Sequence, residues 1–230
     1  MESEFDDYAG NYDAALNQGL AFSGEPKEYF ARERVRWLAA QLGSLGMRPV
    51  RVLDFGCGTG DTSPHLLEEF QARMVVGVDA SRESLDVARA THADPRLRFE
   101  ALDDLEPSGR FEVAYCNGVF HHVQPEQRLD ALRYVHRSLS DGGHFGFCEN
   151  NPWNPGTRLV MRRIPFDRDA QLLSPPLARA LLARAGFEVL RTDFLFFFPR
   201  ALSVLRPLEA RLASVPAGAQ YMILCRKGTW

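Results

Sequence analysis

The nine residues VLDFGCGTG, from Val52 to Gly60, decide how this chain folds. A short apolar run ends in an acidic residue, and three glycines follow at alternate positions. This order is typical of a buried parallel strand that leads into a turn around a nucleotide. We therefore expect a strand over residues 50–56, and the question is which nucleotide the turn accommodates.

Strand-like and helix-like patterns alternate around this turn. Further strands are expected at 74–80, 97–102, 111–117 and 144–150, and helices at 25–42, 64–70, from Ser81 onward and at 128–139. Such alternation implies right-handed crossovers and a doubly wound α/β domain, whose parallel sheet is covered by helices on both faces. The last third is expected to add a helix at 175–185, strands at 187–199 and 221–227, and a partly helical connection at 200–220.

Composition limits the classes of function. The chain has 230 residues, of which 45% are hydrophobic, which suits one domain with a sizeable core. A net charge of −3 does not favour nucleic acid or a membrane surface as partner, and no apolar run approaches the roughly 20 residues that span a bilayer. The four cysteines show no CxxC or Cys/His ligand spacing, so we expect a reducing cytoplasmic location and no metal site.

The glycine pattern argues against a phosphate-bearing ligand. A dinucleotide fingerprint requires G-x-G-x-x-G, but Asp61 stands where the third glycine belongs, and no Gly-Lys-Ser/Thr follows. A ligand with an amino-acid end and a nucleoside end fits better. Asp54 can attract its amine, and Asp79, about 20 residues after the turn, can accept hydrogen bonds from ribose hydroxyls.

The motifs VLDFGCGTG, GVDAS and YCNGVFHHV, in this order between residues 50 and 150, resemble those of class I S-adenosylmethionine-dependent methyltransferases of the small-molecule, bacterial type. The resemblance implies a Rossmann-like, mostly parallel seven-stranded sheet in the order 3-2-1-4-5-7-6, with strand 7 antiparallel. It also implies S-adenosylmethionine as the cofactor, without a metal. The single domain, 1–230, then comprises an N-terminal helical cap (1–45), a cofactor-binding core (50–150) and an acceptor-side segment with the final strands (151–230).

The resemblance assigns roles along the cofactor. Asp54 is expected near the methionine amine, Asp79 at the ribose, and Asp103, in preference to Asp104, at the adenine. The N-terminal FDDYAGNYD resembles a lid over the cofactor in which Tyr8 and Tyr12 take part. The predicted cofactor-binding residues are Tyr12, Asp54, Gly56, Cys57, Gly58, Thr59, Gly60, Asp79, Ala80, Ser81, Asp103, Asn117 and Gly118.

Catalytic residues are less strongly indicated. His122, or its neighbour His121, and Glu149 are hypothetical general bases, against the alternative that the histidines are buried structural residues. The sulfonium already activates the methyl group, so the reaction requires mainly alignment of the acceptor and exclusion of water.

The acceptor is expected to contact residues after the fifth strand. Asn150, Trp153 and Arg158 offer hydrogen-bonding groups, a ring face and a cation, which favours a small polar metabolite such as a sugar or glycan precursor. The run FLFFFP (194–199) leaves open an apolar wall for a quinone-like or lipid acceptor. A nicotinamide-dependent oxidoreductase and a non-catalytic, cofactor-binding regulatory module remain alternatives. The sequence does not indicate an oligomeric state.

Overall fold

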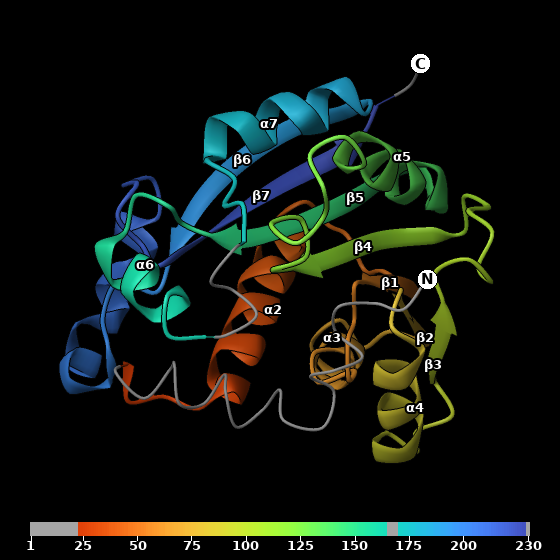
Figure 1. Ribbon diagram of the computed structural model, residues 1–230, viewed down its shortest axis with the longest axis horizontal. Helices are drawn as coiled ribbons and strands as arrows, with labels where there is room; N and C mark the ends of the chain where they lie inside the picture. Colours follow the sequence, from red (N-terminus) through yellow and green to blue (C-terminus); the bar gives the residue numbers. More distant parts are fainter. Residues whose placement is uncertain (1–22, 165–169, 229–230) are drawn as a thin grey trace.

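One seven-stranded sheet organises the molecule (Figure 1). The computed structural model describes residues 23–164 and 170–228. The strands are β1 (Arg51–Phe55), β2 (Met74–Asp79), β3 (Leu97–Ala101), β4 (Phe111–Asn117), β5 (Leu139–Asn150), β6 (Phe187–Leu195) and β7 (Gln220–Lys227). Their order is β3-β2-β1-β4-β5-β7-β6, with β1 to β5 parallel and β7 antiparallel to both of its neighbours. This arrangement confirms the predicted topology.

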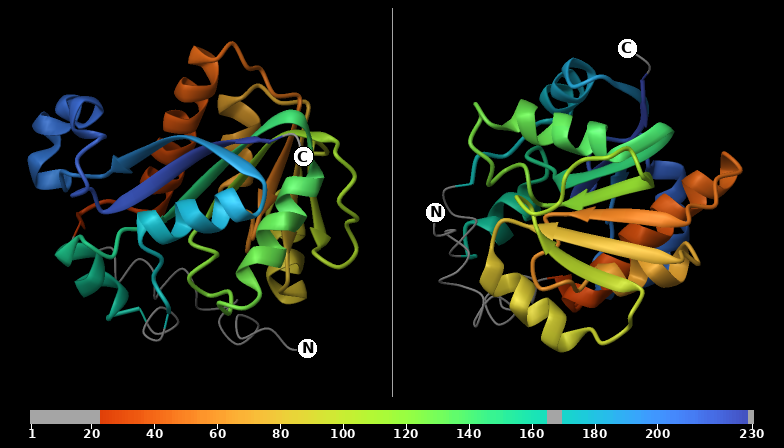
Figure 2. Two further views of the ribbon diagram at one scale, coloured as in Figure 1. Left: turned by 90° about the horizontal axis from the view of Figure 1, so that it is seen from above. Right: turned by 90° about the vertical axis from the view of Figure 1, so that its right-hand side faces the viewer.

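Helices cover both faces of the sheet (Figure 2). They are α2 (Lys27–Ser44), α3 (Ser63–Glu69), α4 (Arg82–Thr91), α5 (Arg128–Ser138), α6 (Pro155–Met161), α7 (Pro175–Arg184) and α8 (Glu209–Leu212), with the 3-10 helix η4 (Arg200–Leu208) before the last. Buried side chains of α2, α3 and α4 form one core, and those of α5 and α7 form the other. Within the described residues, no helix combines the length and apolar character that a membrane crossing needs.

The alternation of side chains along β1 explains why Val52, Leu53 and Phe55 are all apolar and where the acid Asp54 points. Val52 packs in the core under α2 and α3, whereas Leu53 and Phe55 pack in the opposite core. Asp54 therefore shares the face of Val52, since successive strand residues point to opposite sides. This places the carboxyl under α2, at the end of the strand.

Two boundaries differ from expectation. The strand expected over 187–199 ends at Leu195, because Phe196 has a φ of 63° that extended backbone does not adopt. β5 begins earlier than expected, and its register to β4 jumps between the pairs Phe111/Leu139 and Val113/His144. Gly142 and Gly143 lie in this irregular stretch and do not end the preceding helix, which stops at Ser138.

Candidate cofactor and active site

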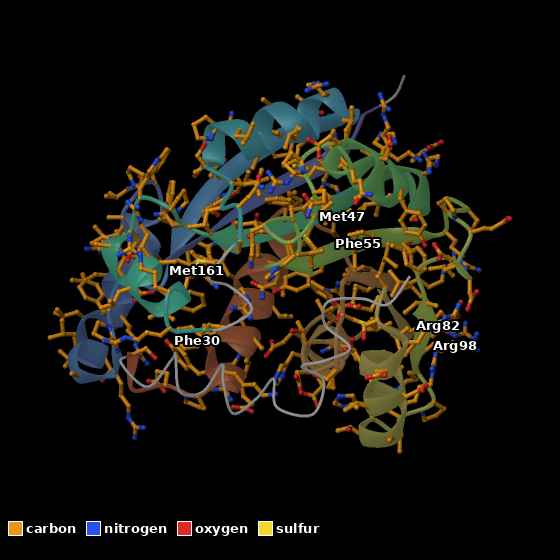
Figure 3. The ribbon with its side chains drawn as sticks, viewed as in Figure 1. Phe30, Met47, Phe55, Arg82, Arg98 and Met161 are labelled. Carbon is orange, nitrogen blue, oxygen red and sulfur yellow. The ribbon has the colours of Figure 1, made fainter. Side chains whose placement is uncertain are left out.

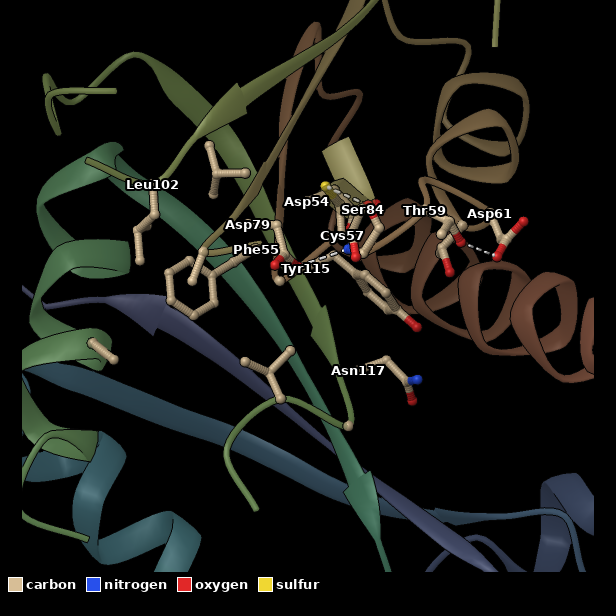
Figure 4. A pocket seen from close by; sticks show the side chains of 18 of the residues that line it. Asp54, Phe55, Cys57, Thr59, Asp61, Asp79, Ser84, Leu102, Tyr115 and Asn117 are labelled. Atoms are coloured by element: carbon tan, nitrogen blue, oxygen red, sulfur yellow. Dashed lines mark hydrogen bonds between the residues drawn. The ribbon is translucent and has the colours of Figure 1, made fainter. Parts of the chain in front are cut away.

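A cavity of about 1050 Å³ opens at the carboxyl ends of the central strands (Figure 4). Its lining includes Asp54 of β1, Asp79 of β2 and Asn117 of β4. β1 and β4 are neighbours although β2 and β3 intervene in the chain, so the cavity lies where the strand order reverses. Ligands of open α/β sheets bind at this position.

The glycine loop comprises residues 56–60, of which residues 56–59 line the cavity and Gly60 is buried against Phe99 and His92. Gly56, Gly58 and Gly60 have φ values of 70°, 53° and 80°, which side chains rarely tolerate. A Cβ on Gly56 would lie 2.3 Å from a methyl group of Val119, whereas one on Gly58 would meet nothing within 4 Å. Gly56 therefore leaves space for Val119 and also lines the cavity, whereas Gly58 faces open space; that both contact the cofactor stays a prediction.

Asp79 connects the glycine loop to the start of α4. One carboxylate oxygen accepts from the amide of Gly58 at 2.8 Å, and the other accepts from the amide of Ser81 at 2.9 Å. The Ser81 hydroxyl is buried and accepts from the amide of Ser84 at 3.1 Å, so it caps α4. Ala80 and Ser84 line the cavity on either side of this cap.

Asp54 is buried with an exposed fraction of 2%. Burial raises the pKa of its carboxyl to about 7; the hydroxyl of Ser63, which donates to it at 2.7 Å, opposes this shift, and the negative charges of Asp79 and Asp61 add to it. No described residue places a cation against this carboxyl. A positively charged ligand group in the cavity would favour its ionised form.

The remaining loop side chains tie the loop to its surroundings. Asp61 accepts from the Thr59 hydroxyl at 2.8 Å and pairs with Lys27 of α2 at 3.0 Å. The Cys57 thiol fills the space above Gly77, where a Cβ would approach its sulfur to 2.8 Å, and burial raises its pKa. The acid in place of the third glycine therefore anchors α2 to the loop.

The structure separates the two acids after β3. Asp103 lines the cavity, whereas the Asp104 side chain pairs with Arg82 at 3.2 Å. Arg82 lies on the β3 side of the molecule, away from Phe55 at the end of β1 (Figure 3). This arrangement supports the choice of Asp103 as the adenine-side acid.

Asn117, Gly118 and His122 line the cavity at the end of β4. The side-chain oxygen of Asn117 is buried and has no hydrogen-bond partner among the described residues. The His122 ring lies against that of His121, with centroids 4.1 Å apart.

Glu149 lies beneath these histidines and does not line the cavity. Its side chain is completely buried; one oxygen accepts from the Phe120 amide at 2.8 Å, and the other contacts His121 Nδ1 at 2.6 Å. The carboxylate therefore holds the segment after β4 in place. Of the hypothetical bases, His122 lines the cavity, whereas His121 and Glu149 do not.

The three predicted acceptor residues do not line the cavity. The Asn150 oxygen accepts from Gln220, the Trp153 ring stacks on Phe194, and Arg158 is exposed on α6. Polar side chains of the same segment bind the main chain of residues 216–219. The polar pattern after β5 thus belongs largely to a structural turn, and the acceptor contacts stay a prediction.

The predicted lid residues Tyr8 and Tyr12 lie outside the described residues. The described residues contain no group of three or more histidine, cysteine or acidic side chains placed to hold a metal ion.

Arg34 is a cavity residue that the sequence analysis missed. It lies on α2 and lines the cavity beside Tyr115 of β4. The signal was present, because Arg34 interrupts the buried helical stripe formed by Ala31, Val35 and Leu38. A polar residue on an apolar face of a helix marks a special environment.

Known proteins that are similar to this chain include several methyltransferases. Residues 52–143 match a family profile described as a methyltransferase domain. A trans-aconitate 2-methyltransferase of Deinococcus radiodurans is 38% identical over 93 residues, which are 40% of this chain and 35% of that protein. A demethylmenaquinone methyltransferase of Thermus thermophilus is 27% identical, over 87% of this chain and 98% of that protein.

The chain spans 35% of the Deinococcus protein and 49% of an N-demethylindolmycin N-methyltransferase of Streptomyces griseus, so about a third to a half of these relatives.

Solved structures share the fold. An S-adenosylmethionine-dependent methyltransferase from Mesorhizobium loti aligns with a TM-score of 0.59 and 24% identity, covering 81% of this chain and 96% of that chain. One from Archaeoglobus fulgidus aligns with a TM-score of 0.59 and 17% identity, covering 84% and 94%. With its strand order, its glycine loop and its matched domain, the chain belongs to the class I S-adenosylmethionine-dependent methyltransferases.

Proposed function

We propose that this protein transfers the methyl group of S-adenosylmethionine to a small-molecule acceptor. The observation that carries the proposal is Asp54, a buried acid in the cavity wall against which no described residue places a cation. An ammonium group bound there would supply the missing charge, and Gly58 leaves room for a ligand to approach the backbone. The methionine part of the cofactor carries such a group.

The other cofactor contacts follow the wall of the cavity. Asp79 is proposed to accept from the ribose hydroxyls, since its carboxylate lines the cavity at the end of β2 and is held in place by the backbone amides of Gly58 and Ser81. Asp103 is proposed to face the adenine, and Asn117 with Gly118 to lie beside the sulfur. Ser81 contributes through its cap of α4 and not through direct contact.

The cofactor supplies an activated methyl group on a sulfonium. The residues of this chain have to hold the acceptor in line with that group and exclude water. Where the acceptor must lose a proton, His122 is the proposed general base, since it lines the cavity. Glu149 is proposed to act indirectly, by holding His121 and the Phe120 amide in place.

A small polar metabolite remains the proposed acceptor class. Asn117, His122 and Arg34 give the inner part of the cavity a polar and cationic character. The aromatic run after β6 turns elsewhere, because Phe196 packs on Tyr29 and Phe30. The names of the relatives point to a small carboxylate and to a quinone as acceptors of those proteins. A sugar or glycan precursor stays one hypothesis within the polar class.

An acceptor screen tests this proposal. The purified protein is incubated with S-adenosylmethionine and, separately, trans-aconitate, demethylmenaquinol and nucleotide-linked sugars, and formation of S-adenosylhomocysteine is followed by mass spectrometry. We expect turnover with a polar acceptor, lost in Asp54→Asn and retained in the matched exposed control Asp86→Asn.

The other hypotheses predict different results. Tight binding of S-adenosylhomocysteine without turnover of any acceptor would favour a regulatory module. Preference for NADH over S-adenosylhomocysteine would overturn the proposal in favour of an oxidoreductase.

A further inference from the structure

Two stretches of the chain, residues 150–164 and 196–219, form one surface outside the cavity. They contain α6, η4 and α8, which lie together at the left of Figure 1 and at the left of the view from above in Figure 2. Hydrogen bonds join the two stretches: Asn154 Nδ2 donates to the carbonyl of Ala217, and the Thr157 hydroxyl donates to that of Ala219, both at 2.7 Å. The helices of this end of the molecule therefore present a continuous face.

This surface is rich in exposed apolar side chains. It holds six of the eleven large apolar side chains that are exposed in the described part of the chain, namely Trp153, Leu159, Leu202, Val204, Leu208 and Val215. Val204 is 81% exposed, and none of the nine residues of η4 is buried. Single exposed apolar residues are ordinary, but several of them together mark a surface that contacts another molecule or a membrane.

The same surface carries a positive charge, although the whole chain has a net charge of −3. Its two stretches contain six arginines and one acid, Glu209, which gives a net charge of +5. By sequence, residues 165–169 add one arginine and two acids and leave the total at +4. We call this surface, residues 150–164 and 196–219, the basic end. The expectation that net charge disfavours a membrane surface therefore does not extend to it.

Most of this charge is not compensated within the described residues. The carboxylate of Glu209 accepts from the amides of Phe197 and Phe198 at 3.2 and 3.0 Å, and Arg206 pairs with Glu25 at 2.8 Å. The other five arginines are exposed and form no ion pair with a described residue; they are Arg158, Arg162, Arg163, Arg200 and Arg211. An anionic partner would supply the counter-charge.

We propose that the basic end docks reversibly on the surface of an anionic lipid membrane. Guanidinium groups bind lipid phosphates in forked hydrogen bonds, while leucine, valine and tryptophan side chains enter the boundary between headgroups and acyl chains. A nucleic acid would also attract the arginines, but it offers no apolar phase for Leu202 and Val204. The apolar side chains between the arginines therefore favour lipid.

Docking at the basic end would bring the cavity close to the membrane. α6 begins shortly after the carboxyl end of β5, and the cavity opens at the carboxyl ends of β1 and β4, which run parallel to β5. Both therefore lie at the same edge of the sheet. The inference goes beyond the proposed function and does not depend on it, because binding to lipid requires neither cofactor nor acceptor.

Sedimentation of the whole chain with lipid vesicles tests the proposal. Vesicles of phosphatidylcholine alone are compared with vesicles that contain equal parts of phosphatidylcholine and phosphatidylglycerol. We expect the anionic vesicles to bind the protein more tightly by about tenfold or more, since each basic residue near an anionic surface adds to the affinity. Raising potassium chloride from about 0.05 M to about 0.5 M should weaken this binding, because salt screens the attraction.

A pair of double substitutions locates the electrostatic contact. Arg162→Glu with Arg163→Glu reverses two charges of the basic end and should weaken binding to anionic vesicles by about tenfold or more. The matched control is Arg48→Glu with Arg73→Glu. These two arginines are exposed, form no ion pair with a described residue, and precede β1 and β2 at the opposite edge of the sheet. The control should bind like wild type.

A second pair locates the apolar contact. Leu202→Ser with Val204→Ser should weaken binding to anionic vesicles by about tenfold. Leu45→Ser with Val50→Ser changes the same residue types between α2 and β1, where they are 51% and 47% exposed, and should bind like wild type. Because all these side chains are exposed, we expect the midpoints of urea unfolding to stay at the wild-type value.

Three results would overturn the inference. The first is wild type that binds both kinds of vesicle equally or binds neither. The second is vesicle binding by the variants of the basic end that is as tight as that of their controls. The third is tighter binding to double-stranded DNA than to anionic vesicles, which would assign the arginines to a nucleic acid. A dimer that Leu202→Ser with Val204→Ser abolishes, without vesicle binding by wild type, would assign the surface to a second copy of the chain.

Discussion

Replacing Asp54 by asparagine should stabilise the ligand-free protein and weaken its affinity for the cofactor. Asparagine keeps the shape of the side chain and an oxygen for the Ser63 hydroxyl, but removes the charge. Burial raises the pKa of this carboxyl from its ordinary value of 3.8 to about 7. That difference is about three units, and each unit corresponds to 1.36 kcal/mol, so the ionised form costs at most about 4 kcal/mol in the folded state.

The pH dependence of stability has a definite sign. Between about pH 4 and pH 7, the folded protein holds a proton on Asp54 that the unfolded chain has released. The free energy of unfolding of wild type therefore falls as pH rises through this window, and it levels off above pH 7. We expect the stability gain of Asp54→Asn to be near zero below pH 4 and largest above pH 7.

The affinity of wild type for the cofactor should instead rise as pH rises. An ammonium group requires the ionised carboxyl, so wild type should bind S-adenosylhomocysteine about tenfold more weakly for each pH unit below 7. Asp54→Asn should bind weakly at every pH.

Urea unfolding and calorimetry between pH 5.5 and 7.5 measure both effects, with Asp86→Asn as the exposed control. Asp54→Asn that is less stable than wild type at pH 7.5, and yet binds S-adenosylhomocysteine normally, would refute the assignment of this residue.

Four further substitutions separate effects on folding from effects on binding. Gly56→Ala should destabilise the protein by about 2–4 kcal/mol in urea unfolding, because the new methyl group collides with Val119 and φ is positive. Gly58→Ala should lower the free energy of unfolding by about 1–2 kcal/mol and should chiefly weaken S-adenosylhomocysteine binding in calorimetry. Ser81→Ala should lose about 1 kcal/mol of stability and leave affinity within twofold, because its hydroxyl caps α4. Asp79→Ala should weaken S-adenosylhomocysteine binding by 1–3 kcal/mol; an unchanged calorimetric affinity would contradict its assignment to the ribose.

The sequence predicted the fold well because its strongest signals are local. The apolar run of β1 and the three glycines with positive φ each depend on a few adjacent residues. The order of the last two strands came from the family resemblance, and the structure confirms it. The end of β6 escaped prediction, because the positive φ of Phe196 has no signature in side-chain chemistry.

The site was less predictable because spatial neighbours decide which polar side chains are available to a ligand. Ser81 and Asn150 are of residue types that bind ligands, yet the structure places the first in a helix cap and joins the second to Gln220. Glu149 resembled a base until its two buried hydrogen bonds were located. Conversely, Arg34 belongs to no sequence motif, and its place in the cavity follows only from the packing of α2 against β4.

The cavity differs from the rest of the molecule in how its charged side chains are paired. Elsewhere, several surface charges are paired, as in Arg96 with Asp94 and Arg226 with Glu188. In the cavity, Asp54 and Arg34 are buried without described counter-charges, an arrangement that lowers the stability of the empty protein. A ligand with an ammonium and a carboxylate group would remove both penalties at once, so binding and folding become coupled. Ligand binding should therefore raise the free energy of unfolding by more than the buried contact area alone predicts. If the two charges bind different groups, Asp54→Asn and Arg34→Gln should each reduce this gain independently of the other.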